Sequence, residues 1–138
     1  MGITYVWVKV ANPLKPRQAA RIKMLVDSGV GYSMVPRTVL EKLGIKPRHK
    51  RSFMLADGSD VERSLSEAKF EFQNESATSP VIFGEPDDAA LLGMVTLETL
   101  GLTLDPFHRR IKSACAGWRR QLRPLPMLLA HQTLKGRR

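Results

Sequence analysis

Leu25-Val26-Asp27-Ser28-Gly29-Val30 is an apolar run that ends in a carboxylate, a hydroxyl and a glycine. The apolar residues upstream extend it into a strand with little polar interruption, which is typical of a buried strand. Gly29 permits a tight turn and Ser28 bonds locally to backbone, so the chain is expected to turn directly after the acid. A carboxylate at the end of a buried strand costs free energy unless it has a partner or a chemical role. Asp27 is therefore a candidate functional residue, and the alternative is a turn that only changes the direction of the chain.

The positive charge of the chain is concentrated at its C-terminal end. The 138 residues carry a formal net charge of +9, with 22 Lys and Arg against 13 Asp and Glu. All 13 acidic residues lie at or before Asp105, and nine of the basic residues follow it. We therefore expect one neutral domain over residues 1–106 and a basic, flexible tail over residues 107–138. Within the tail, residues 111–122 are candidates for a helix formed on binding, and residues 127–130 for a last strand on a partner chain.

Several classes of protein are disfavoured by the sequence. Cys115 is the single cysteine, so no intrachain disulfide can form, and a reducing, cytoplasmic location is expected. We expect no signal peptide and no membrane span, because neither a basic-then-apolar start nor an apolar run of about 18 residues is present. The histidines lack zinc-ligand spacing, and no glycine-rich phosphate loop is found. The acidic residues Asp57, Asp60 and Glu62 are interpreted as turn and strand residues and not as metal ligands.

Short strands and two short helices are predicted along residues 1–106. Valines alternate with aromatic and charged residues over Tyr5–Val10, which predicts a strand that forms a hairpin with the strand ending at Val26. Pro36 and Gly44 suit the start and the end of a two-turn helix. Residues 46–51 are expected to form an exposed link. Asp57-Gly58 predicts the tip of a β-hairpin over Ser52–Val61.

The second half of the domain is expected to repeat the order of elements found in the first half. We predict a polar loop over Gln73–Pro80 and a strand over Val81–Gly84, with Asp87-Asp88 as a solvated turn. A buried strand, a glycine, a short helix and a final strand, Leu102–Asp105, then follow. Leu43-Gly44-Ile45 and Leu100-Gly101-Leu102 occupy equivalent places, which indicates a weak internal repeat of a strand–loop–helix unit. Only the first copy carries a carboxylate.

These features, in this order, resemble the retroviral-type (retropepsin-like) aspartic proteases and their small prokaryotic relatives over about residues 3–106. Asp27-Ser28-Gly29 matches the catalytic Asp-Thr/Ser-Gly of that family, and residues 56–59 look like its flap. Leu91-Leu92-Gly93 matches the strand that backs the catalytic loop. The resemblance implies an all-β, retropepsin-like half-barrel with one or two short helices, active as a homodimer.

In such a family member, two aspartates hydrolyse a peptide bond of an extended or unfolded protein without a metal or other cofactor. One carboxylate takes a proton from water while the other donates a proton to the carbonyl oxygen, because two such close groups share one proton. This chain offers one such aspartate, Asp27, so the second comes from an identical chain across a two-fold axis. Ser28 would bond across the dimer, Gly29 would let backbone approach the carboxylates, and Leu91, Leu92 and Gly93 would support the loop.

The resemblance also implies which residues contact substrate. The flaps would close over an extended peptide and pair with its backbone. The expected lining consists of apolar and flap residues: Val30, Met54, Leu55, Ala56, Asp57, Gly58, Val81 and Ile82.

Two other functions stay open from the sequence. Val30 is bulkier than the small residue usual at this place, which keeps a catalytically inactive dimerisation or peptide-binding module as an alternative. The nine basic residues of the tail favour weak, non-specific contact with nucleic acid as a second alternative.

Overall fold

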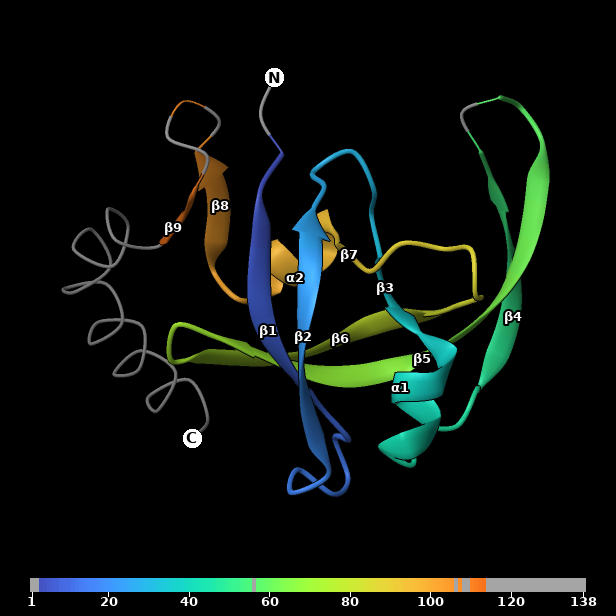
Figure 1. The fold of residues 1–138 in the computed structure, drawn as a ribbon, viewed down its shortest axis with the longest axis horizontal. Coiled ribbons are helices and arrows are strands. Elements are labelled where there is room, and N and C mark those ends of the chain that lie inside the picture. Colours follow the sequence, from blue (N-terminus) through green and yellow to red (C-terminus); the bar gives the residue numbers. More distant parts are fainter. Residues whose placement is uncertain (1–2, 56, 106, 108–109, 114–138) are drawn as a thin grey trace, which may run out of the picture.

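The computed structural model describes residues 3–55, 57–105, 107 and 110–113, and it forms a mostly β structure with two short helices (Figure 1). In chain order, the elements found in these residues are β1 (Tyr5–Ala11), β2 (Ala19–Val26), β3 (Ser33–Pro36), α1 (Arg37–Lys42), β4 (His49–Met54), β5 (Asp60–Phe72), β6 (Glu75–Gly84), β7 (Leu91–Leu92), α2 (Met94–Thr99), β8 (Leu102–Asp105) and β9 (Arg110–Ser113). The expected all-β class with short helices is confirmed.

One strongly curved sheet organises the molecule. Its strand order is β1-β2-β7-β3-β6-β5-β4, and β1 also pairs with β5, so the sheet bends back on itself. The two-residue β7 lies between β2 and β3, parallel to the first and antiparallel to the second. This arrangement brings the ends of β2 and β7 together, although about 65 residues separate them in the chain.

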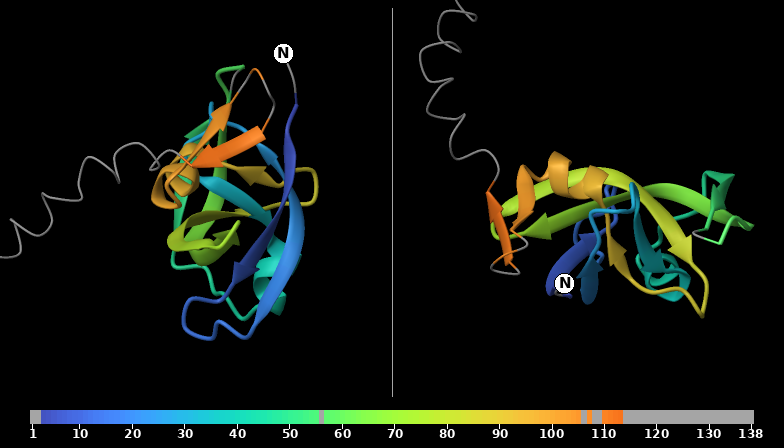
Figure 2. Two further views of the ribbon diagram at one scale, coloured as in Figure 1. Left: turned by 90° about the vertical axis from the view of Figure 1, so that its left-hand side faces the viewer. Right: turned by 90° about the horizontal axis from the view of Figure 1, so that it is seen from above.

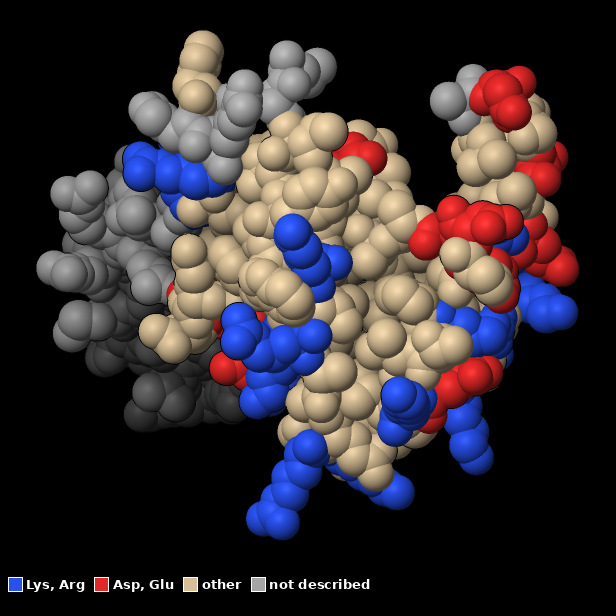
Figure 3. Space-filling view, viewed as in Figure 1, with Lys and Arg blue, Asp and Glu red and all other residues tan. Residues whose placement is uncertain are grey.

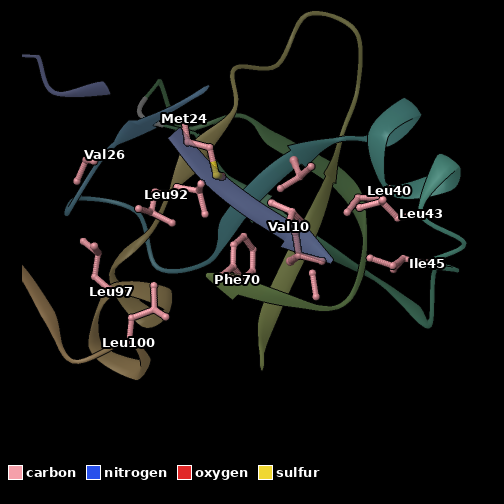
Figure 4. Packing of buried hydrophobic residues seen from close by; sticks show 14 of the residues in the cluster. Val10, Met24, Val26, Leu40, Leu43, Ile45, Phe70, Leu92, Leu97 and Leu100 are labelled. Carbon is pink, nitrogen blue, oxygen red and sulfur yellow. The ribbon is translucent and has the colours of Figure 1, made fainter. Parts of the chain in front are cut away.

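The hydrophobic core fills the inside of this curved sheet. The alternation predicted for β1 is confirmed, because Val8 and Val10 are fully buried while Trp7 on the other face is 55% exposed. Figure 4 shows Leu40 of α1 and Leu43, which caps that helix, on one side of the core. Leu97 of α2 and its cap Leu100 lie on the other side, with Val10 and Phe70 between them. Each helix is short because it only covers one end of the sheet.

The β4–β5 hairpin projects from the body, as the side and top views show (Figures 1 and 2). Its strands pair in antiparallel register from His49↔Leu65 to Met54↔Asp60, and its tip lies at Asp57-Gly58, as predicted. Gly58 has a φ of +88°, a backbone conformation that favours glycine. β4 begins at His49, so the expected link over residues 46–51 is shorter than predicted.

Two local predictions were wrong. Gln73–Pro80 is not a loop: β6 begins at Glu75, and the turn is limited to Gln73 and Asn74, both with positive φ. The Ser and Thr residues that suggested a loop alternate across the two faces of β6, and Ser79 points inward, where hydrogen bonds satisfy its hydroxyl. The short β3 was also not predicted, since it lies directly against the first helix in the sequence.

The residues expected to form the tail are described only at their start. β9 pairs antiparallel with β8, and its Ile111 is buried in the core, so this part of the segment is a strand and not a helix. Residues 114–138, with Cys115 and the apolar patch at 127–130, lie outside the described residues. In the part of the chain that is described, the helices are too short to span a bilayer.

Candidate active site

Asp27 follows directly on β2, and the neighbouring β7 fixes its backbone. β2 and β7 are parallel, with Leu25 opposite Leu91 and Val26 opposite Leu92. The ladder continues one residue further, because the Asp27 backbone N–H donates to the Leu92 carbonyl at 3.0 Å. The side chain is half-buried, while Ser28 and Gly29 are exposed. The strand pair therefore delivers a carboxylate to the surface on a fixed backbone.

The turn after Asp27 is shaped around its carboxylate. The Gly29 N–H donates to Asp27 Oδ1 at 2.9 Å, and the Val30 N–H donates to the Asp27 carbonyl at 3.3 Å. A Cβ atom on residue 29 would lie 3.1 Å from the same Oδ1, closer than side chains usually approach. The absence of a side chain at Gly29 thus lets backbone approach the Asp27 carboxylate and hydrogen-bond to it.

The second half of the loop rests on the start of α2. The Met94 and Val95 N–H groups donate to the carbonyls of Val30 and Gly31, each at 2.9 Å. At Gly93, the residue before Met94, an added Cβ atom would lie 2.5 Å from the Gly31 carbonyl oxygen, which is closer than Cβ atoms approach in real structures. Gly93 therefore allows the Asp27 loop to lie directly on the chain behind it.

Three buried hydroxyls lie under the loop, and the sequence analysis did not identify them. Ser33 Oγ accepts a hydrogen bond from the Gly93 N–H at 2.9 Å and lies 2.6 Å from Thr96 Oγ1. Thr96 Oγ1 in turn lies 2.9 Å from Ser79 Oγ. All three side chains are at most 1% exposed. The network joins β3, α2 and β6 beneath the catalytic-loop candidate, and single serines in apolar strands were its only trace in the sequence.

The predicted flap residues lie at the end of the β4–β5 hairpin. Met54 and Leu55 are 76% and 45% exposed, so they present apolar surface beside the tip. Asp57 Oδ1 accepts hydrogen bonds from the Ser59 hydroxyl at 2.6 Å and from the Ser59 N–H at 2.9 Å, and these bonds lower the pKa of Asp57. Ala56 lies outside the described residues. Acidic side chains gather toward this tip in Figure 3, while basic ones lie nearer its base.

The other predicted lining residues differ in how much surface they offer. Val30 is half-buried in the loop itself. Val81 and Ile82 lie on β6 opposite Ser33 and Met34, but Val81 is fully buried in the core and Ile82 is 6% exposed. Both belong to the strand that pairs with β3 in the sheet, and they offer almost no surface to a substrate.

Ion pairs fasten the loop between β6 and β7, which was expected to be solvated at Asp87-Asp88. Arg63 donates to both oxygens of Asp88, at 2.8 and 3.2 Å, and this contact lowers the pKa of Asp88. Arg37 contacts Glu85 at 2.8 Å, and the pKa of Glu85 is lowered by that hydrogen bond. Residue spacing could not show these pairs, because their partners are 25 and 48 positions apart.

The curved sheet, the Asp-Ser-Gly loop on parallel strands and the projecting hairpin are those of an aspartic-protease half-barrel. The sequence profile described as "Aspartyl protease" matches residues 13–96, which include Asp27 and the hairpin, and the chain belongs to that family.

A solved structure supports the fold independently. The structure titled "EIAV protease complexed with the inhibitor HBY-793" superimposes with a TM-score of 0.57 at 15% sequence identity, over 75% of this chain and 93% of that one. The retropepsin-like fold expected from the sequence is thus confirmed. The search of curated proteins found no match.

Proposed function

We propose that this chain is one subunit of a homodimeric aspartic endopeptidase, with the two Asp27 carboxylates facing each other across the two-fold axis. The observation that carries the proposal is the Asp27 loop, in which backbone from two strands and the Gly29 N–H hold one carboxylate at the surface. The equivalent place after β7 holds Gly93 and Met94 and no acid. A second carboxylate must therefore come from another chain.

The surface beside the loop supports a second copy as the occupant. A cavity of about 220 Å³ opens next to Ser28 and is lined by residues of α2 and β8: Met94, Leu97, Thr103 and Leu104. A partner whose own loop faces Asp27 would also cover this cavity and bury its apolar lining. Ser28 is exposed at its rim, where its hydroxyl is available to bond across the interface.

In the proposed reaction, one Asp27 is ionised and the other is protonated. The ionised carboxylate takes a proton from water as the water oxygen bonds to the peptide carbon, and the other carboxyl gives its proton to the carbonyl oxygen. When the C–N bond breaks, the protonated carboxyl gives its proton to the leaving nitrogen while the ionised carboxylate takes a proton from a hydroxyl of the tetrahedral intermediate, and the products are a carboxylic acid and an amine. The pair then again holds one proton, so no cofactor is consumed.

The substrate would be an extended or unfolded polypeptide. The β4–β5 hairpin carries Met54 and Leu55 exposed beside its tip, and such a hairpin can add the backbone of an extended peptide as a further strand. Apolar side chains of the peptide would pack on these two residues.

The test is cleavage of an unfolded protein across a pH series from acidic to neutral, with and without pepstatin, together with the sedimentation behaviour of the protein. We expect cleavage on the acidic side that pepstatin blocks, and a specific activity that falls when the protein is diluted below its dimerisation range. A stable dimer that cleaves nothing at any pH would instead identify a non-catalytic peptide-binding module, with Val30 crowding the carboxylates.

A further inference from the structure

A second cavity of about 220 Å³ lies between the Asp27 loop and the base of the β4–β5 hairpin. Tyr32 lines it from the loop side, and the basic residues Arg48, His49 and Arg51 line it from the hairpin side. Leu65 and Ser66 of β5, with Glu67 and Pro80, complete its wall. The cavity was not predicted from the sequence, which placed these basic residues in an exposed link.

The charges in this cavity do not cancel. Glu67 is the one carboxylate in the lining, and it pairs with Arg48 at 3.2 Å. Among the described residues, no carboxylate forms an ion pair with Arg51. A guanidinium stays charged at every pH at which the protein would act, so the cavity keeps one positive charge without a counter-ion.

Tyr32 holds Arg51 in place. Arg51 Nη1 donates to the Tyr32 hydroxyl at 3.1 Å, and its guanidinium lies 5.8 Å from the centre of the Tyr32 ring. Phe53, two residues further along β4, packs edge-on against the same ring at 6.4 Å. The arginine therefore belongs to a fixed cluster, and a preorganised guanidinium binds a carboxylate at a low cost in conformational entropy.

The cavity lies within reach of the proposed substrate. Tyr32 is five residues after Asp27, so the two are separated by at most about 17 Å. Arg51 lies on β4, one arm of the hairpin that would cover the peptide. A peptide extended over Asp27 and under the hairpin advances about 3.3 Å per residue, so a side chain within about five positions of the scissile bond reaches the cavity.

We infer that this cavity is a specificity subsite for a carboxylate of the substrate, and that Arg51, oriented by Tyr32, is the residue that binds this carboxylate. The inference deepens the proposed function and rests on it for the direction of the peptide. Because each subunit of the proposed dimer carries this cavity, the inference predicts a preference for Glu or Asp at one outer position on each side of the scissile bond.

The experiment uses a peptide that the protein cleaves, blocked at both ends, with Glu or Gln placed in turn at each of the five positions on either side of the scissile bond. We expect one position on each side of the bond at which Glu raises kcat/KM about tenfold over Gln, mainly through KM, and the ratio should decrease as salt is added. A third peptide, which ends with Gln and an unblocked α-carboxylate at the responsive position on the C-terminal side of the bond, distinguishes a side-chain carboxylate from a chain end.

Two variants and one control assign the preference. Arg51→Gln should reduce the Glu-to-Gln ratio to about one, and Arg51→Lys should retain part of it because the charge remains without the planar fork. Lys50→Gln is the matched control: Lys50 neighbours Arg51 on β4 but does not line the cavity, and its substitution should leave the ratio unchanged. Thermal unfolding of each variant checks that the fold is kept.

The outcomes separate this inference from the proposed function. Cleavage with no Glu preference, or with a preference that survives Arg51→Gln, overturns the inference and leaves the endopeptidase proposal standing. If no peptide is cleaved, the endopeptidase proposal fails, and fluorescence anisotropy then decides the inference alone, with labelled peptides of one apolar sequence that carry Glu or Gln at each position in turn. Equal binding of the Glu and Gln peptides at every position overturns the inference.

Discussion

Two strand–loop–helix units of this chain end in the same way but begin differently. α1 and α2 each have six residues, and each is followed by a Leu-Gly pair whose glycine has a positive φ, +76° at Gly44 and +72° at Gly101. In both, the glycine N–H donates back to a helical carbonyl at 3.0 Å. The internal repeat expected from the sequence is therefore visible in the backbone.

The difference lies where each strand ends. After β2 the chain presents Asp27, Ser28 and Gly29 at the surface, whereas after β7 it presents a buried Gly93. The second unit has no acid and instead supports the loop of the first, through the N–H groups of Met94 and Val95. In the proposed function, the first unit would carry the chemistry and the second would position it, so a pair of acids would require a pair of chains.

The largest expected effect comes from removing the acid of the first unit. Asp27→Asn keeps the size of the side chain and one oxygen but cannot take a proton from water. We expect the rate of peptide cleavage to fall by at least about a thousandfold, as for loss of a general acid–base group. Steady-state cleavage of an unfolded protein measures this, and sedimentation should show an unchanged dimer. Cleavage that persists in the variant removes Asp27 from the catalytic role.

The next effect tests the supporting role of the second unit. Gly93→Ala places a Cβ atom 2.5 Å from the Gly31 carbonyl oxygen, so the backbone must shift. We expect a loss of roughly 2–3 kcal/mol in the free energy of unfolding, measured by urea denaturation. Gly31→Ala is the matched control, because nothing lies within 4 Å of its added Cβ, and its effect should stay within about 0.5 kcal/mol. Equal effects of the two substitutions would mean that the close contact is not rigid.

A smaller effect is expected from the hydroxyls that join the two units. Thr96→Val keeps the shape of the side chain but leaves Ser79 and Ser33 each with one hydrogen bond fewer. We expect a loss of about 1–2 kcal/mol in the free energy of unfolding. Thr99→Val, on the exposed side of the same helix, removes only the hydrogen bond from the Thr99 hydroxyl to the Val95 carbonyl. It should change the free energy of unfolding by less than about 0.5 kcal/mol. Thermal unfolding of the two variants side by side would show whether the buried network matters.

The smallest effect concerns the ion pair that fastens the loop before β7. The native pKa of Asp88 is lowered by Arg63, so this pair stabilises the fold above the unfolded pKa and is lost as the pH falls through the lower native pKa. Asp88→Asn should cost about 1 kcal/mol at pH 7, and the difference from wild type should shrink below about pH 4. Asp87→Asn, at an exposed neighbour, is the control. A difference that is the same at pH 7 and pH 3 would contradict this account.

Local patterns in the sequence were sufficient for most of the fold. Period-two valines located β1, Asp-Gly located the hairpin tip, and two Leu-Gly pairs located the ends of both helices. Each of these signals depends on residues that are neighbours in the chain. The bounds of β8 were predicted correctly for the same reason.

The features that were missed depend on residues far apart in the chain. The Ser33–Thr96 hydrogen bond spans 63 positions and the Arg63–Asp88 pair spans 25, so no local pattern contains them. The first part of β6, residues 75–80, looked like a loop because its Ser and Thr residues are buried or paired only once the sheet has formed, whereas its second part was correctly predicted as a strand over Val81–Gly84. Val81 was predicted to contact substrate, but it is fully buried. It lies on β6 beside Ser33 of β3, and this parallel pairing of distant segments is not visible in the local sequence.

The central claim is that each active site needs one Asp27 from each of two chains. It is tested most directly by mixing wild-type chains with Asp27→Asn chains and allowing subunits to exchange. The wild-type concentration is held fixed, well above the dimerisation range. If each active site needs one Asp27 from each chain, an equal amount of the variant should reduce the cleavage rate to about half, because half of the wild-type chains then sit in mixed dimers. A cleavage rate that does not change on addition of the variant would show that a single chain is sufficient, and would contradict the account.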